Sequence, residues 1–158
     1  MKIGVVSDTH SYPLPAQMME DFKSVDFIIH AGDFCSLDVL QSLQKIKEVK
    51  AVYGNMDGGE MRRILPRRQI ISCGRFTICV YHGQGHPQML LSKVQAEFKN
   101  DKVDVVIYGH SHKVMNEVID GILYFNPGSP NDMVFAPYCS YGILDVDDKI
   151  TGRIVEVK

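Results

Sequence analysis

The sequence predicts an α/β protein, built as a mixed-sheet sandwich with helices on its outer faces. Short apolar runs rich in β-branched residues dominate the chain and indicate strands. Through the first two thirds these runs alternate with segments of helical periodicity, whereas several runs follow one another directly in the last third. Alternation favours parallel strands with helical crossovers and a succession of strands favours antiparallel pairing, so we expect both in one fold.

Ten of the apolar runs are predicted to be strands. They cover residues 3–7, 26–30, 50–53, 69–73, 76–81, 103–108, 114–119, 123–126, 140–146 and 149–156. The dipeptides Gly74-Arg75 and Asp147-Asp148 each separate two runs by only two residues, which predicts hairpins. A third turn is expected at Asp120-Gly121, between two later runs.

Four segments are predicted to be helices, over residues 13–23, 37–46, 60–65 and 87–99. The first begins with prolines, and the second follows Ser36, a residue type that favours the N-cap. The third is closed by Pro66. The fourth opens with Pro87, since proline is favoured in the first helical turn, and it then repeats apolar residues at Leu90, Leu91, Val94 and Phe98.

Length and composition limit the possible classes of protein but do not indicate a particular function. A chain of 158 residues suits one domain, which we expect to span residues 1–158. Seventeen Lys and Arg against nineteen Asp and Glu give a formal charge of −2, so no broad basic surface indicates nucleic acid. No stretch approaches the ~18 apolar residues of a membrane helix, and none near the start resembles a signal peptide. Four scattered cysteines without a C-x-x-C pair favour a reducing compartment, so we expect a cytoplasmic protein with no membrane partner.

Five of the apolar runs end alike, with aspartate, histidine or asparagine at or just past the carboxyl end. The endings are Ser7-Asp8-Thr9-His10, His30-Ala31-Gly32-Asp33, Tyr53-Gly54-Asn55-Met56-Asp57, Tyr81-His82-Gly83 and Tyr108-Gly109-His110-Ser111-His112. One such ending would usually be an ordinary polar loop. Five of them at the edge where α/β sheets collect their ligands indicate a functional site.

The residue types at these endings indicate a metal centre. Imidazole and carboxylate together suit Mn, Fe, Ni or Zn better than Ca or Mg alone. Asp8 and His10 are two residues apart, as are His110 and His112, so each pair can project to one side of an extended segment. The glycines at positions 32, 54, 83 and 109 allow sharp turns or close approach beside the candidates. Seven candidate ligands are more than one tetrahedral ion can coordinate, and they fit two ions that share a bridging ligand.

The ordered motifs Asp-x-His, Gly-Asp, Gly-Asn-x-Asp, His-Gly and Gly-His-x-His resemble those of the calcineurin-like metallophosphoesterases. The resemblance is strongest to their small single-domain prokaryotic phosphodiesterase branch, and the later Asn126-Pro127-Gly128-Ser129 resembles a turn of that branch. It spans nearly the whole chain. What it implies is an α/β fold of four layers, a metallophosphoesterase sandwich of two mixed β-sheets flanked by helices.

The resemblance also implies two divalent metal ions and a hydroxide that bridges them and attacks phosphorus. One ion would be held by Asp8, His10, Asp33 and His112, and the other by Asp33, Asn55, His82 and His110, with Asp33 as the shared ligand. Mn²⁺ is the first expectation, with Ni²⁺, Fe²⁺, Zn²⁺ and Mg²⁺ as alternatives. Asn55 and Asp57 are the expected catalytic residues: the Asn55 amide would also bind a phosphate oxygen, and Asp57 would orient a metal ligand.

Two departures from the family pattern bear on activity. Many relatives carry histidine where this chain has Met56, and that histidine is thought to protonate the leaving group. Methionine cannot donate a proton, and general acid help is worth about 10²–10⁴-fold, so we expect weak activity on poor leaving groups. Gln84 stands where a second histidine of a His-Gly-His motif is common, and we expect the nearby His86 to be simply exposed.

Other residues carry weaker signals. His30 is either a hydrogen-bonding partner of the site or a satisfied core histidine. The arginines at positions 62, 63, 67 and 68 are interpreted as a solvated surface, with anion binding as the alternative. The eight methionines are interpreted as gap-filling core residues.

The leading hypothesis is therefore a metal-dependent phosphodiesterase acting on small phosphodiesters. The alternative is a metal-binding protein-interaction scaffold on the same fold with little or no catalysis, as in the retromer subunit of this architecture. Such scaffolds tend to lose ligands, and here all seven positions are filled. Homo-oligomerisation stays open.

Overall fold

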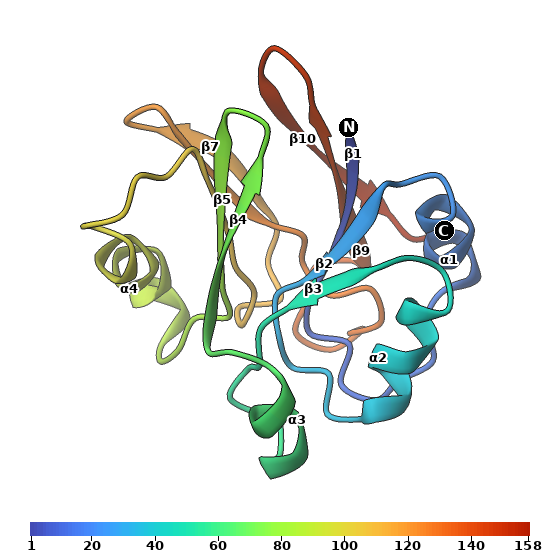
Figure 1. Cartoon of the computed structure of the whole chain (residues 1–158). Coiled ribbons are helices and arrows are strands. Elements are labelled where there is room, and N and C mark those ends of the chain that lie inside the picture. Colours follow the sequence, from blue (N-terminus) through green and yellow to red (C-terminus); the bar gives the residue numbers. More distant parts are fainter.

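The computed structural model describes all 158 residues and consists of two five-stranded sheets packed face to face (Figure 1). The ten strands are β1 (Lys2–Val6), β2 (Phe27–His30), β3 (Val49–Ala51), β4 (Arg68–Cys73), β5 (Phe76–Tyr81), β6 (Val105–Ile107), β7 (Met115–Ile119), β8 (Ile122–Asn126), β9 (Ser140–Val146) and β10 (Ile150–Glu156). Sheet A has the order β10-β9-β1-β2-β3 and sheet B the order β4-β5-β6-β8-β7. Each of the ten predicted strands is present, although β3 and β6 are shorter than predicted.

Both sheets are mixed, as predicted. In sheet A, β1, β2 and β3 are parallel, while β9 runs antiparallel to β1 and β10. In sheet B, β5, β6 and β8 are parallel, and the edge strands β4 and β7 are antiparallel to their neighbours. The three predicted turns each join an antiparallel pair: β4 with β5, β9 with β10, and β7 with β8.

The register of the parallel strands brings their carboxyl ends level. Val6 pairs with His30, and His30 pairs with Ala51, so the segments that follow β1, β2 and β3 leave sheet A at one edge. In sheet B, Val80 near the end of β5 pairs with Ile107 at the end of β6. The polar segments after all five strands therefore start from the same end of the sandwich.

Four α-helices connect the strands: α1 (Ala16–Phe22), α2 (Leu37–Gln44), α3 (Gly59–Ile64) and α4 (Leu90–Glu97). α2 begins as predicted, because the Ser36 side chain accepts a hydrogen bond from the Asp38 N–H at 3.1 Å. α1 begins three residues later than predicted, since Pro15 is extended and a residue that precedes proline is biased away from helix. The fourth predicted helix opens with a 3₁₀ turn over Pro87–Met89 before α4. None of the helices has the length and apolar character needed to span a bilayer.

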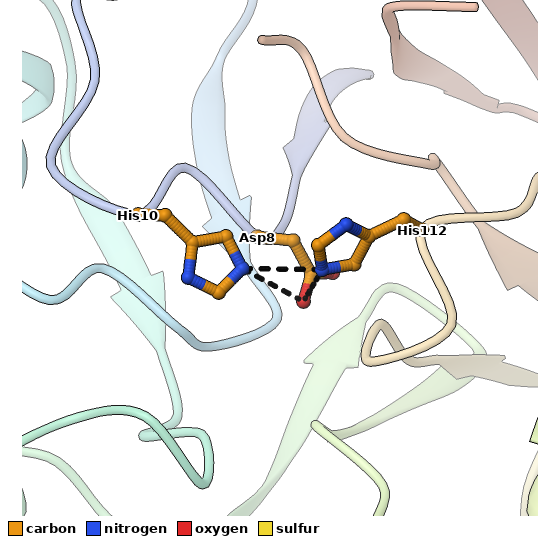
Figure 2. A group of neighbouring side chains, drawn as sticks. All are labelled: Asp8, His10 and His112. Atoms are coloured by element: carbon orange, nitrogen blue, oxygen red, sulfur yellow. Dashed lines mark hydrogen bonds and ion pairs between the residues drawn. The ribbon is translucent and has the colours of Figure 1, made fainter. Parts of the chain in front are cut away.

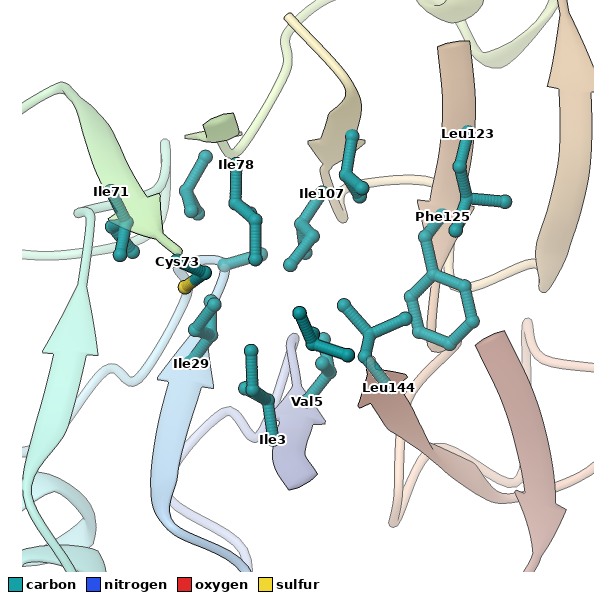
Figure 3. Packing of buried hydrophobic residues seen from close by; sticks show 14 of the residues in the cluster. Ile3, Val5, Ile29, Ile71, Cys73, Ile78, Ile107, Leu123, Phe125 and Leu144 are labelled. Atoms are coloured by element: carbon teal, nitrogen blue, oxygen red, sulfur yellow. The ribbon is translucent and has the colours of Figure 1, made fainter. Parts of the chain in front are cut away.

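Three apolar clusters divide the molecule into four layers, which confirms the predicted sandwich. The largest contains 16 buried residues and fills the space between the two sheets (Figure 3). A second cluster joins sheet A to α1 and α2, and a third joins sheet B to α4. All four cysteines are free thiols, and Cys73 and Cys79 are buried in these clusters.

Phe125 of β8 connects the two sheets by filling a hollow in the opposite one. Its ring is fully buried, and it lies against two glycines on neighbouring strands of sheet A. A Cβ atom at Gly142 would stand 2.4 Å from Phe125 Cε1, and one at Gly152 would stand 2.6 Å from Cε2. The missing side chains on β9 and β10 therefore make the space that this ring occupies.

Replacing Phe125 with alanine should lower the free energy of unfolding by about 3–5 kcal/mol, because a buried aromatic side chain is lost and a cavity remains. Urea unfolding measures this change. Val118→Ala is the control, since Val118 is largely exposed on β7 and its truncation should cost under about 0.5 kcal/mol. Equal losses in the two variants would contradict the role given to Phe125.

Candidate metal centre

The structure brings all seven predicted ligands together where the ends of the two sheets meet. Asp8 and His10 follow β1, Asp33 follows β2, and Asn55 follows β3, so these four side chains come from sheet A. Sheet B supplies the three remaining histidines, His82 after β5 and His110 and His112 after β6.

One group consists of Asp8, His10 and His112, whose donor atoms point toward one another (Figure 2). Nε2 of His10 lies 3.1 Å from Nε2 of His112. Oδ1 of Asp8 lies 3.3 Å from the His112 nitrogen and 3.9 Å from the His10 nitrogen. Two imidazole nitrogens and one carboxylate oxygen therefore face a common point, which is how a divalent ion is held.

A second group consists of Asp8, Asp33 and His82. Nε2 of His82 lies 3.2 Å from Oδ2 of Asp33 and 3.9 Å from Oδ1 of Asp8. The same Asp33 oxygen also lies 3.9 Å from Nε2 of His10, so both carboxylates reach histidines of both groups.

Asn55 and His110 adjoin the second group through the Asn55 amide oxygen. This oxygen lies 3.0 Å from Nε2 of His82 and 2.8 Å from Nδ1 of His110. The rings of His82 and His110 stand edge to face with centroids 5.3 Å apart. The two residues therefore add one oxygen and one nitrogen to the donor set.

The charge balance of the site calls for a cation. Asp8 is fully buried and Asp33 is 2% exposed, yet neither carboxylate has a lysine or arginine within ion-pair distance. Buried carboxylates without a cation are strongly disfavoured. Their only partners within ion-pair distance are histidines, and these are neutral when they bind metal. The donor set therefore fits divalent metal ions.

The titration of the residues reflects this balance. Burial alone would raise the pKa of Asp8, but His82 and His112 hold it below its usual range. Burial opposes protonation of His82 and His112, and the facing carboxylates overcome it and raise both pKa values. For His112, Asp8 and Asp132 together raise the pKa to about 9. Without metal, protons on these rings supply the missing positive charge.

Each histidine has its second ring nitrogen fixed by a neighbour, so that the other nitrogen faces the centre. Nδ1 of His82 lies 2.8 Å from the Ala31 carbonyl oxygen, and Nε2 of His110 lies 2.7 Å from that of Gly85. Nδ1 of His112 pairs with the Asp132 carboxylate. Nδ1 of His10 lies 3.4 Å from Sγ of Cys35.

The backbone at the site adopts conformations that L-residues rarely occupy. Five predicted ligands have positive φ angles: Asp8 (57°), His10 (47°), Asp33 (59°), His110 (70°) and His112 (55°). Each such residue costs on the order of 1–3 kcal/mol and persists only where its surroundings hold it, and strain of this kind concentrates at functional sites. The left-handed turns direct consecutive side chains into one small volume.

Two glycines permit the close packing of the loops, as the sequence predicts. A Cβ atom at Gly54 would stand 2.1 Å from Oδ1 of Asp33, and one at Gly109 would stand 2.6 Å from Oδ2 of Asp8. Any side chain at either position would displace a carboxylate of the site.

Asp57 ties together the loops that follow β2 and β3. Its carboxylate is almost fully buried and accepts three backbone hydrogen bonds, from the N–H groups of Asp33 (2.9 Å), Gly54 (2.7 Å) and Cys35 (2.8 Å). All of its contacts are to backbone. Asp57 therefore positions Asp33 through the main chain.

The segment after β8 supports the site and includes a residue that the sequence analysis missed. The Ser129 hydroxyl donates to the Asp8 carbonyl oxygen at 2.8 Å, and the Asn126 amide donates to the Gly109 carbonyl oxygen at 2.9 Å. The Asn131 amide donates to the Thr9 carbonyl oxygen at 3.0 Å. The missed residue is Asp132, the partner of His112. The signal for it was its place three residues after the Asn-Pro-Gly-Ser motif.

Three of the four arginines, Arg62, Arg63 and Arg67, are exposed, which agrees with a solvated surface, but three of the four also form specific contacts. Arg62 donates to the carbonyl oxygens of Asp57 (2.8 Å) and Asn55 (3.0 Å). Its guanidinium also lies 5.0 Å from the centre of the Tyr53 ring. Arg67 and Arg68 form ion pairs with Glu97 (2.7 Å) and Asp101 (3.0 Å).

A polar cavity of about 190 Å³ opens beside the second group. It is lined by Asn55, His82, Arg62, Arg67, Gln84, the tyrosines at positions 53 and 81, and two glycines. Gln84 is exposed, and so is His86, as predicted; the His86 ring accepts a hydrogen bond from the Gln88 N–H at 3.3 Å.

His30 is both a core residue and a neighbour of the site. It is fully buried and stacks on Phe34, and burial lowers its pKa to about 3. Both ring nitrogens are satisfied, by the Thr9 hydroxyl at 3.1 Å and the Gly32 N–H at 3.1 Å. It therefore supports two of the metal-site loops as a neutral ring.

A sandwich of two mixed sheets with clustered carboxylates and imidazoles at the strand ends defines a metal-dependent phosphoesterase-type hydrolase. Residues 1–149 match the family model for the calcineurin-like phosphoesterase superfamily domain. The chain belongs to this superfamily, whose members use divalent metals.

Relatives and solved structures agree with this assignment. A probable metallophosphoesterase from Methanocaldococcus jannaschii is 37% identical over 163 residues, covering 100% of this chain and 82% of the relative. The structure of an archaeal phosphodiesterase is 29% identical, with a TM-score of 0.80 over 98% of this chain and 100% of that one. Vps29 from Entamoeba histolytica, solved as a single mutant, has a TM-score of 0.81 over 100% of both chains at 22% identity. The last of these shows a shared fold alone.

Asp57→Asn should lower the free energy of unfolding by about 1–3 kcal/mol, because the amide cannot accept all three backbone hydrogen bonds. It should also weaken Mn²⁺ binding, since Asp33 loses its support. Urea unfolding and metal titration measure the two effects. Asp147→Asn removes the same charge from an exposed turn and serves as the control. Should the two variants behave alike, Asp57 has no positioning role.

Without metal, stability should fall as the pH rises from about 6.5 to about 9. The pKa of His112 rises from the ordinary 6.5 to about 9 on folding, so its proton favours the folded state. That contribution is complete below pH 6.5 and is lost as the pH passes through 9. Urea unfolding of chelator-treated protein measures the change, and His112→Gln should make it smaller. A pH-independent stability over this range would refute the expectation.

Proposed function

We propose that the protein is a metal-dependent phosphodiesterase that hydrolyses small phosphodiesters at a dinuclear metal site. The observation that carries the proposal is the pair of buried carboxylates, Asp8 and Asp33, whose only partners within ion-pair distance are histidines. Residues 1–158 are proposed to work as one domain, since the metal-site loops come from both sheets.

The proposed ligands are those expected from the sequence. Asp8, His10, Asp33 and His112 would hold one ion, and Asp33, Asn55, His82 and His110 the other. Asp33 would bridge, which is supported by the distances from its Oδ2 to Nε2 of His82 and Nε2 of His10, 3.2 and 3.9 Å. Mn²⁺ is the proposed metal, because mixed carboxylate and imidazole donors suit it. When bound, such ions neutralise phosphoryl oxygens and lower the pKa of water so that hydroxide forms near neutral pH.

Asn55 has a free donor for the substrate. Its amide oxygen is directed at His82 and His110, which leaves the Nδ2 hydrogens directed elsewhere, and they form no hydrogen bond within the chain. The side chain is exposed at the polar cavity. As a catalytic residue, Asn55 would donate a hydrogen bond to a phosphate oxygen and orient it. Asp57 would contribute by positioning Asp33.

Met56 bears on which esters can be cleaved. Its backbone N–H donates to Oδ1 of Asp33 at 2.7 Å, so this residue stands at the centre, and its thioether has no proton to give. Asp57 cannot replace it, because the Asp57 oxygens are occupied by backbone N–H groups. Leaving groups of low pKa, which depart without protonation, are therefore the favoured ones.

A metal-binding scaffold with little catalysis is the second candidate. The consecutive apolar residues Met133, Val134 and Phe135 are strongly exposed near the centre, as a binding surface for another protein would be. The complete donor set argues for the enzyme. Turnover separates the two candidates.

Purified protein with Mn²⁺ should hydrolyse bis(4-nitrophenyl) phosphate, and Asp33→Asn should reduce kcat at least ~100-fold, because the bridging carboxylate is lost. Release of nitrophenolate measures the rate, and chelation of the metal should abolish it. Asp147→Asn, which changes an exposed turn, should retain full activity. Metal binding without turnover, for Mn²⁺, Ni²⁺, Fe²⁺, Zn²⁺ and Mg²⁺ alike, would favour the scaffold.

A further inference from the structure

A second hollow, of about 380 Å³, opens on the metal centre from the side of His10 and His112. Apart from these ligands and Cys35 and Asp132, its lining is Tyr12, Met56, Val134 and Phe135, which define the apolar pocket. We infer that the apolar pocket binds an apolar, flat ester substituent of the substrate, such as an aryl group. The inference rests on the proposed function and adds the class of ester that the site accepts.

The four apolar side chains are strongly exposed and lie together, unlike apolar residues scattered singly over a surface, so their exposure needs an explanation. Their exposed fractions are 59% for Tyr12, 60% for Met56, 79% for Val134 and 76% for Phe135. Holding apolar surface in water costs roughly 25 cal/mol per Å², and a cluster of such residues round one hollow marks a binding site. The interpretation of all methionines as core residues is thus wrong for Met56, and also for the exposed Met1, Met89 and Met133.

The loop that carries two of these residues is held in place by the metal centre. One oxygen of Asp132 pairs with Nδ1 of His112, and the other accepts hydrogen bonds from the N–H groups of Val134 (2.7 Å) and Phe135 (3.0 Å). The Phe135 ring stands edge-on to the His112 ring, with centroids 6.5 Å apart. The wall of the pocket is therefore built onto a metal ligand, which preorganises it for binding.

The opposite wall is attached in the same way. The Met56 backbone N–H donates a hydrogen bond to the Asp33 carboxylate, and Sγ of Cys35 contacts Nδ1 of His10. Because His10 and His112 line the pocket and direct Nε2 toward the centre, a group in the pocket adjoins a phosphoryl group bound there.

The charges around the apolar pocket indicate which substituent it binds. With metal holding its two histidines neutral, the only charged side chain of the pocket is Asp132, which is paired with His112 and with two backbone N–H groups. The polar cavity on the other side of the centre is lined instead by Arg62, Arg67 and Gln84. An anionic or strongly polar substituent is therefore better placed beside the arginines, and a neutral apolar one in the apolar pocket. Phenols are more acidic than aliphatic alcohols, so a phenolate leaves more readily from a centre that lacks a proton donor.

The test compares phenylphosphonate with methylphosphonate, which share the anionic head and differ in one substituent. Calorimetry on the Mn²⁺-loaded protein should give about tenfold tighter binding of phenylphosphonate, the preference that burial of one ring face supplies. Phe135→Ser and Val134→Ser together should reduce the preference to about twofold or less. Met133→Ser is the matched control, because Met133 lies on the same loop, is 88% exposed and is outside the pocket lining; it should keep the full preference.

Two outcomes overturn the inference: equal or absent binding of the two phosphonates to the wild-type protein, or a preference that the two serine substitutions leave intact. Either would make the exposed loop a docking surface for another chain or a bystander. Hydrolysis of bis(4-nitrophenyl) phosphate is measured separately, so a missing turnover counts against the proposed phosphodiesterase, and a missing phosphonate preference counts against the pocket.

Discussion

The organisation of the molecule depends on two carboxylates that are buried without a lysine or arginine beside them. Asp8 and Asp33 lie at the ends of adjacent strands of sheet A, and the histidines that face them come from both sheets. Positive charge must come from outside the chain or from protons on those rings. The level strand ends, the left-handed ligand residues and the glycines at close approach all serve to place these carboxylates.

Much of this arrangement is readable from the sequence because the strand ends carry the chemistry. Short apolar runs rich in β-branched residues predict the ten strands, and the polar, glycine-containing segments that follow many of them mark where those strands end. The seven candidate donors stand out because they follow those runs, and the structure brings them together. A helix start such as that of α1 was misplaced because a proline shifts the local backbone preference, which periodicity alone does not register.

The residues that contact and support the candidate ligands are harder to predict from the sequence. Asp132 contacts His112 across 20 positions of the chain, and Arg62 is backed by carbonyl oxygens rather than by a carboxylate. The only sequence signal for Asp132 is its place three residues after the Asn-Pro-Gly-Ser motif, and its contact depends on how two loops meet in space. The Arg62 contacts reach residues five and seven positions earlier, and they have no periodic or motif signal because the path of the intervening loop sets them. Met56 is exposed because of the path of the loop after β3. Its apolar character alone predicts burial instead.

The hydrogen bond from Ser129 to the Asp8 carbonyl joins residues 121 positions apart, and β1 pairs with β9 near the far end of the chain. During synthesis β1 must wait until residues 140–146 have been made before its second neighbour exists, and contacts of such separation are slow to form. The left-handed turn at Asp8 has no support from this bond until then. A growing chain therefore carries the candidate ligands long before they are gathered into one site, which is completed only in the last stage of folding.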